Sequence, residues 1–205
     1  MIQFLEERVI EIRKSRIREI IPKSSRYIDS LFVYSNREGV NPEEIAAMFN
    51  VESGWDNYAV SQRGAAGIPQ LMPQKAYELG LWPIYKYDEY IENEKMFSEG
   101  KITISERDNF ISNYVKELKS LNDKSIDARF DPYLSMSAGI VLKGELSNRY
   151  RNPDMAHAAY NAGSGAVDNW VDDGWNGSDM GIPYGETRNY VKKVNLTIDE
   201  LRLYL

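Results

Sequence analysis

Hydrophobic residues recur along most of this chain at intervals of three and four, the spacing that places them on one face of an α-helix. With turn and cap signals as boundaries, the pattern predicts helices at about residues 4–20, 27–38, 42–53, 73–79, 105–121, 132–143 and 153–162. Thr197 and Glu200 have the spacing of a capping box, which predicts the start of a last helix. Strand-like alternation is scarce, and we expect a loop or short β-ribbon at about 55–72. The predicted fold class is therefore mainly α.

The helix predicted at 42–53 carries the first candidate for chemistry. Asn41 is a favourable N-cap, and Gly54 follows the last turn. Glu52 shares one face of this helix with three apolar residues, Ile45, Met48 and Phe49. A carboxyl group held against apolar side chains has its charged form disfavoured, so we expect Glu52 to have the raised pKa that a general acid needs. The segment alone leaves two interpretations open, a general acid and a surface glutamate at a frayed helix end.

Composition narrows the class of protein. The chain has 205 residues, enough for one domain with a substantial core, and its net charge of −6 argues against a nucleic-acid-binding face. It has no cysteine, which excludes disulfides without fixing the compartment. No apolar run approaches the ~18 residues of a membrane span. The N-terminal segment does not have the pattern of a secretory signal, so we expect either a trimmed protein or one that reaches its site by another route.

Four segments carry a more specific signal. They are residues 52–61 (ESGWDNYAVS), 64–73 (GAAGIPQLMP), 158–163 (AAYNAG) and 183–191 (PYGETRNYV). In this order and at this approximate spacing, they resemble the catalytic domain of the soluble-type lytic transglycosylases, a lysozyme-like family that acts on bacterial peptidoglycan. One such motif is a weak signal, but four in order make chance similarity improbable. The resemblance covers about residues 25–80 and 131–196.

The resemblance implies a lyase that cleaves the β-1,4 bond between N-acetylmuramic acid (MurNAc) and N-acetylglucosamine (GlcNAc). In this family one glutamate acts first as acid and then as base, and the product ends in 1,6-anhydro-MurNAc. Glu52 stands at the position of that glutamate. The residues agree with a single-carboxylate mechanism, because the nearby Asp56 lies beyond Gly54 and is better explained as a turn or capping residue.

The resemblance also implies substrate-binding residues. In the glycine-rich region these are Ser61, Gln70 and Met72. Taken alone, Ser61 and Gln70 are more often loop residues that satisfy backbone groups, and Met72 equally suits core packing. Their place in a sugar-binding groove is therefore an expectation that rests on the family.

Four further substrate-binding residues are implied towards the C-terminus: Tyr160, Asn161, Glu186 and Tyr190. Tyr160 suits stacking on a sugar face, with core packing as its alternative. Asn161 is also placed for a helix C-cap, and Glu186 for a first-turn charge that the helix dipole favours. Tyr190 follows Glu186 by one helical turn, so we expect both to face the same way.

Metal and cofactor chemistry has little support in the sequence. His157 is the only histidine. The chain therefore cannot form a metal site from several histidines, and a Ser-His triad would have to use His157 itself. We expect a structural role for His157, no metal site and no cofactor. Gly64, Gly67 and Gly163 fit tight turns or close backbone approach and form no phosphate-binding pattern.

We expect residues 1–205 to form one lysozyme-like domain. It would comprise an N-terminal helix at 1–21, motif-bearing parts at 25–80 and 131–196, and an inserted segment at 81–130. That segment is longer than the usual connection in the family, and Pro69 stands where the family commonly has Met. The aromatic residues of the segment either extend the glycan groove, form a surface for a protein partner, or pack within a plain helical insertion. They are Trp82, Tyr85, Tyr87 and Tyr90.

Two other functions stay open. A goose-type muramidase shares the single glutamate and the glycine-rich loop, but needs a second carboxylate to hold water. A non-catalytic component of a virion or secretion machine would keep the fold and bind glycan. We expect peptidoglycan strands as the partner, no nucleic acid and no membrane span. Action at the cell wall, in the periplasm or outside the cell, fits a trimmed protein as well as a virion-associated one.

Overall fold

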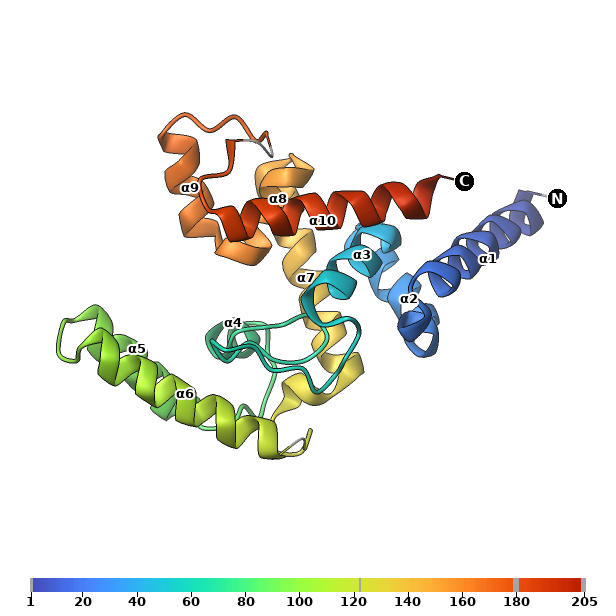
Figure 1. Ribbon diagram of the computed structural model, residues 1–205. Coiled ribbons are helices and arrows are strands. Elements are labelled where there is room, and N and C mark those ends of the chain that lie inside the picture. Colours follow the sequence, from blue (N-terminus) through green and yellow to red (C-terminus); the bar gives the residue numbers. More distant parts are fainter. Residues whose placement is uncertain (1, 122, 179–180, 204–205) are drawn as a thin grey trace. The chain divides into compact units, whose positions relative to one another are not determined.

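The computed structural model describes residues 2–121, 123–178 and 181–203, with side chains from residue 5 onward. Helices dominate the described chain, so the predicted mainly α fold class is confirmed (Figure 1). The chain divides into two compact units. The first unit comprises Met1–Val51 and Ile140–Leu205, and the second unit comprises Glu52–Gly139. That residues 1–205 act as one domain stays a prediction.

The first unit is built from helices at both ends of the chain. It contains α1 (Ile2–Ile20), η1 (Pro22–Tyr27), α2 (Ile28–Glu38), most of α3 (Pro42–Ser53), the later part of α7 (Pro132–Tyr150), α8 (Pro153–Ala162), α9 (Ser164–Asp172) and α10 (Gly185–Arg202). In this unit α8 packs against both α9 and α10, while α1 contacts η1 and α10. The α8–α10 group holds the C-terminal pair of sequence motifs.

The second unit joins a glycine-rich loop to a helical hairpin. After the loop come α4 (Pro73–Glu78), α5 (Tyr87–Ser98), α6 (Ile104–Leu121), η2 (Ala128–Phe130) and the first turns of α7. The hairpin is formed by α5 and α6, which lie side by side (Figure 1).

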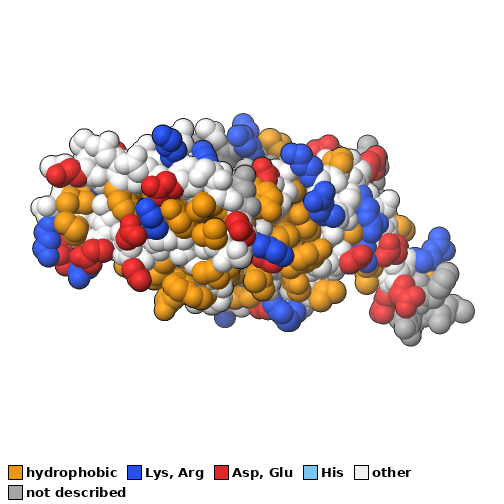
Figure 2. All heavy atoms as spheres, turned by 90° about the horizontal axis from the view of Figure 1, so that it is seen from below, with side chains coloured by type: hydrophobic (Ala, Val, Ile, Leu, Met, Phe, Trp, Pro, Cys, Tyr) orange, Lys and Arg blue, Asp and Glu red, His pale blue; other side chains and the backbone are white. Residues whose placement is uncertain are grey.

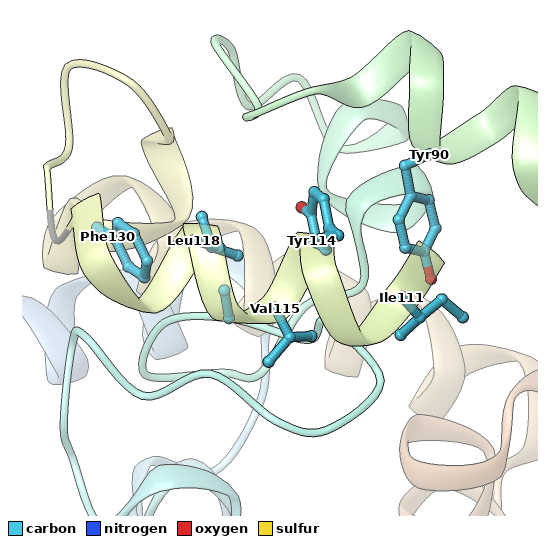
Figure 3. Close-up of a cluster of buried hydrophobic side chains, with 7 residues drawn as sticks. Tyr90, Ile111, Tyr114, Val115, Leu118 and Phe130 are labelled. Atoms are coloured by element: carbon cyan, nitrogen blue, oxygen red, sulfur yellow. The ribbon is translucent and has the colours of Figure 1, made fainter. Parts of the chain in front are cut away.

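A buried cluster lies between the hairpin and the loop. Its members are Ala66, Tyr90, Ile111, Tyr114, Val115, Leu118 and Phe130. Figure 3 shows Ile111, Tyr114, Val115 and Leu118 following one another along α6. Ile111, Val115 and Leu118 recur at the helical spacing from which a helix at 105–121 is predicted. Because Ala66 belongs to the glycine-rich loop, the hairpin supports that loop through a shared hydrophobic core.

Residues 55–72 form a loop with two isolated antiparallel bridges, Val60 with Ala66 and Ala66 with Leu71. This agrees with the prediction of a loop or short ribbon. None of the helices within the described ranges has both the length and the apolar character that a membrane crossing requires. Figure 2 shows one face of the molecule, on which hydrophobic side chains gather in patches between charged side chains of both signs.

The capping box predicted at Thr197 and Glu200 is wrong. Helix α10 continues through both residues, and the Thr197 hydroxyl donates a 3.0 Å hydrogen bond to the Lys193 carbonyl, one turn back. A threonine inside a helix can satisfy its hydroxyl in this way, so its spacing to a later glutamate does not mark a helix start. The sequence pattern also missed α5 and α9, and it ended α7 several residues too early.

Candidate active site

Glu52 lies in the last turn of α3, which persists to Ser53. At the other end of this helix, the Asn41 side chain accepts a 2.9 Å hydrogen bond from the backbone N–H of Glu43, as the predicted cap requires. The apolar face is fully buried, with Ile45, Met48 and Phe49 at 0% exposure. Glu52 itself is partly exposed. Because α3 continues through Glu52 to Ser53, the helix does not fray before Glu52, and the role of Glu52 as a general acid stays a prediction.

The glycine-rich loop follows Glu52 and is joined to the end of α3. The Ser53 hydroxyl donates a 2.8 Å hydrogen bond to the carbonyl of Ile68, near the middle of the loop. Within the loop, Ala66 and Leu71 exchange two backbone hydrogen bonds of 3.1 Å. The loop therefore returns on itself next to the helix turn that carries Glu52.

Ser61 and Gln70 bind the backbone of this loop. The Ser61 hydroxyl accepts hydrogen bonds from the N–H groups of Arg63 and Ala65, at 3.2 and 3.0 Å. The Gln70 amide nitrogen donates to the carbonyls of Ala59 and Gly67, at 3.1 and 2.8 Å. Both side chains therefore shape the loop, and their contacts with substrate stay predictions.

Met72 stands where the loop enters α4. Its side chain is 36% exposed, so the alternative of core packing is wrong. Asp56, the nearest carboxylate after Glu52, accepts a 2.9 Å hydrogen bond from the backbone N–H of Tyr58. That bond is typical of a turn residue, as predicted.

Arg129 anchors the loop from η2. Its guanidinium donates to the carbonyls of Gly64 and Leu71 at 2.8 and 3.1 Å, and to the Tyr114 hydroxyl at 2.7 Å. The same group forms a two-pronged pair with the carboxylate of Asp127, at 2.9 and 2.7 Å. Both charged side chains are almost fully buried, at 0% and 1% exposure. Burial disfavours the charge of Arg129, but the hydrogen bonds and charge of Asp127 outweigh it and raise the pKa of the guanidinium.

Gly67 is required by the same arrangement. Its φ of 80° lies in the left-handed region, and a Cβ atom at this position would meet the Arg129 carbonyl oxygen at 2.0 Å. The glycine therefore serves close backbone approach, one of the two roles predicted for it. Sequence reasoning missed Arg129, whose partners lie 65 and 58 positions away along the chain.

The C-terminal motifs form a pocket in the first unit. It has a volume of about 460 Å³ and is lined by Asn161, Ala162 and residues 183–187. Asn161 lies in the last turn of α8, where its Oδ1 accepts a 2.9 Å hydrogen bond from the Thr187 hydroxyl of α10. Gly163, rather than Asn161, is the C-cap of α8. Glu186 is exposed in the first turn of α10, so the pocket brings together two of the predicted substrate-binding residues.

Tyr190 and Tyr160, the other two residues predicted to bind substrate near the C-terminus, are not among the residues that line this pocket. Tyr190 is only 6% exposed, whereas Glu186 one turn earlier is exposed, so the expectation that both face the same way is wrong. Tyr160 is partly exposed near the end of α8. The substrate contacts of both tyrosines stay predictions.

His157 is fully buried on α8. Burial first, and the nearby charge of Lys143 second, lower the pKa of His157 to about 3. Lys143 is also buried and donates to the Glu44 carboxylate at 3.2 Å and to the Ser147 hydroxyl at 2.7 Å. No three His, Asp or Glu side chains converge as metal ligands would in the part of the chain that the structure describes.

Comparison with known proteins identifies the family. The model of the transglycosylase SLT domain matches residues 29–96 and 109–178, more than half of the chain. The chain belongs to this family. The SLT match includes Glu52 and the first three motifs, whereas the fourth motif at 183–191 lies beyond it. Residues 97–108, between the two matched segments, form the tip of the α5–α6 hairpin.

Two solved structures share the fold of this SLT domain. One is an inactive mutant of the lytic transglycosylase Slt from Pseudomonas aeruginosa, with a TM-score of 0.58 and 22% identity over 85% of this chain. The other is the 70 kDa soluble lytic transglycosylase from Escherichia coli, with a TM-score of 0.59 and 22% identity over 89% of this chain. The predicted lysozyme-like fold is confirmed. The alignments cover 24% and 25% of the two larger chains.

Proposed function

We propose that this protein is a peptidoglycan lytic transglycosylase in which Glu52 is the only acid and base. The observation that carries the proposal is the placement of Glu52 at the end of the buried α3 stripe, directly before a braced glycine-rich loop, within an SLT-family match. The C-terminal pocket with Asn161 and Glu186 supports a second group of substrate contacts.

In this mechanism Glu52 first donates its proton to the oxygen of the β-1,4 bond as that bond breaks. The substrate's N-acetyl group stabilises the cationic carbon at C1 of MurNAc. The Glu52 carboxylate then takes the proton of the MurNAc 6-hydroxyl, whose oxygen bonds to C1 and closes the 1,6-anhydro ring. No water is consumed, and Glu52 ends protonated, ready for another turnover.

The engagement of two carboxylates of the second unit in other contacts favours this lyase over a muramidase. A muramidase of this type needs a carboxylate that holds water, and Asp56 or residues 81–130 would have to supply it. Asp56 is engaged in its turn, and Asp127 is buried in its pair with Arg129. These engagements of Asp56 and Asp127 support a single-carboxylate reaction.

The first experiment compares products from purified peptidoglycan by mass. We expect fragments that end in 1,6-anhydro-MurNAc, one water lighter than reducing ends. The variant Glu52→Gln keeps the shape of the side chain but cannot donate the proton, so we expect its activity to fall by at least about a hundredfold. The same kind of replacement, glutamate to glutamine, is the one carried by the inactive Pseudomonas enzyme.

Glu145→Gln is the matched control, because Glu145 is an exposed residue of α7. It should keep the activity of the unchanged protein. Reducing ends in place of anhydro ends would assign a hydrolase. Full activity of Glu52→Gln would refute the role of Glu52.

The proposed substrate also sets the place of action. Peptidoglycan lies in the periplasm or outside the cell, so we propose that the protein works there, as a wall enzyme or as part of a virion. The protein partner suggested for residues 81–130 stays a prediction.

A further inference from the structure

Three aromatic side chains gather at the surface of the second unit. They are Tyr77 at the end of α4, Trp82 in the α4–α5 connection and Tyr87 at the start of α5. We call them the aromatic triad. Tyr77 and Trp82 are 50% and 61% exposed. By contrast, Tyr85 and Tyr90 pack in or against the buried cluster of the hairpin, so the tyrosine-rich segment divides into a core part and a surface part.

The triad has a defined internal geometry. The rings of Tyr77 and Tyr87 are stacked, with centroids 4.4 Å apart and an angle of 23° between their planes. Trp82 stands nearly perpendicular to both, at 6.0 Å from Tyr77 and 6.3 Å from Tyr87. Each ring therefore limits the freedom of the other two, so a ligand that stacks on them has little side-chain entropy to overcome.

The size of the triad favours a small ligand. An aromatic side chain has about 150–250 Å² of surface, so two half-exposed rings and the less exposed ring of Tyr87 offer at most roughly 300 Å². A stable protein interface needs about 800 Å² from each partner. The triad alone therefore falls well short of a protein-binding surface, whereas one or two sugar rings match it.

The charges around the triad narrow the ligand further. The carboxylates of Glu78 and Asp88 are close enough to contribute to the raised pKa of Tyr87, behind burial and the Tyr77 hydroxyl. Lys75 binds Glu78 and keeps its pKa low, so this carboxylate stays charged at neutral pH. Carboxylates such as that of Asp88 accept hydrogen bonds from sugar hydroxyls.

The triad also continues from the predicted groove. Met72, a predicted substrate-binding residue, is the N-cap of α4, and Tyr77 lies in the last turn of the same helix. At a rise of about 1.5 Å per residue, the five residue steps from Met72 to Tyr77 span roughly 7–8 Å. A glycan strand that contacts Met72 needs little further length to reach the triad.

We propose that Tyr77, Trp82 and Tyr87 form an accessory glycan-binding site that holds the peptidoglycan strand beyond the predicted groove. The inference rests on the proposed function for its substrate class. It assigns the triad to binding and gives it no part in bond cleavage.

The experiment measures binding without cleavage. Purified peptidoglycan is mixed with the full chain carrying Glu52→Gln, and the bound fraction is determined by co-sedimentation. Adding Trp82→Ala or Tyr77→Ala should weaken binding about three- to tenfold, the range that 0.5–1.5 kcal/mol of ring contact gives. Trp82→Tyr keeps a ring at this position and should retain most of the affinity.

The control adds Tyr133→Ala, which removes a 46% exposed tyrosine from α7 in the same unit and should leave binding unchanged. Thermal unfolding of each variant shows that it is folded. Equal binding with and without Trp82→Ala would overturn the accessory site. So would a self-association of the chain that Trp82→Ala abolishes, since the triad would then be an interface between copies.

Failure of the proposed function gives a different pattern. If the chain that carries only Glu52→Gln does not bind peptidoglycan at all, the proposed substrate class is wrong and the accessory glycan-binding site is refuted as well. If the unchanged protein does not cleave peptidoglycan but binding still depends on Trp82, the catalytic proposal fails and the accessory site stands.

Discussion

The guanidinium of Arg129 binds two carbonyl oxygens of one loop, so a single side chain fixes the separation of Gly64 and Leu71. Its own charge is balanced by Asp127 in the same buried network. A buried charge pair of this kind contributes little net stability compared with apolar packing, but removal of one partner is costly. The value of the pair therefore lies in the shape that it gives to the loop beside Glu52.

Arg129→Met should destabilise the protein strongly. It leaves the Asp127 carboxylate buried without its guanidinium partner, and losses of about 3–5 kcal/mol are typical of such changes. Urea unfolding at pH 7 measures the free energy of unfolding directly. A loss below about 1 kcal/mol would show that the pair is solvated or dispensable.

The double variant Arg129→Met with Asp127→Asn is the control for this prediction. It removes the unpaired charge while keeping an oxygen acceptor for the Tyr85 backbone N–H, which Asp127 binds at 3.1 Å. We expect the double variant to be more stable than Arg129→Met alone, because the buried charge is gone.

At the scale of elements, the cap, the apolar stripe and the terminal glycine of α3 all predict the same helix. Asn41 caps its start, the buried stripe runs through its length and Gly54 follows its end with a φ of 61°. Because this helix carries Glu52, the cap at its first turn helps to stabilise the element that positions the candidate active site.

Asn41→Ala should lower the free energy of unfolding by about 1 kcal/mol, the usual value of an N-cap side chain. Asn113→Ala is the control, because Asn113 is an exposed residue within α6 and its loss should change stability by less than about 0.5 kcal/mol. Thermal or urea unfolding measures both. Equal effects of the two variants would contradict the capping role of Asn41.

The elements also show where sequence prediction stops. It identified α3 and α6, whose apolar stripes are regular, and it placed Glu52 correctly at a helix end. It missed α5 because Tyr90 is the only fully buried residue of that helix, which leaves too few apolar positions for a periodic signal. It missed Arg129 because the partners that define its role meet only after the loop and the hairpin have folded together.

For the whole molecule, the buried His157 predicts how stability depends on pH. Its pKa is lowered from 6.5 to about 3 by burial and by the Lys143 charge, against a smaller opposing contribution from Asn195. The folded protein therefore keeps His157 neutral at pH 4–6, where the unfolded chain takes up a proton. Because the unfolded state binds more protons, stability falls as the pH decreases from about 6.5 towards 3.

Between pH 7 and pH 4.5 this single group should cost about 2–3 kcal/mol of stability. The variant His157→Gln has no group that titrates at this position. Between pH 7 and pH 4.5 its free energy of unfolding should therefore fall by about 2–3 kcal/mol less than that of the unchanged protein. The measurement is urea unfolding at both pH values, with each protein compared with itself. Identical pH dependence of the two proteins would contradict the assignment of a neutral, buried His157.

The anchoring of the loop by Arg129 has a consequence for its evolution. Arg129 contacts the main-chain oxygens of Gly64 and Leu71, so neither contact is made through a side chain of the loop. Loop side chains that neither bind the backbone, as those of Ser61 and Gln70 do, nor replace Gly64 or Gly67 can therefore be exchanged while the course of the chain is kept. Pro69 has no backbone N–H to donate. It fits in this loop because Arg129 binds the loop through the carbonyl groups of Gly64 and Leu71. Relatives with different residues at the remaining loop positions can thus share one backbone path, provided that a guanidinium still reaches both carbonyls and that Gly67 is kept.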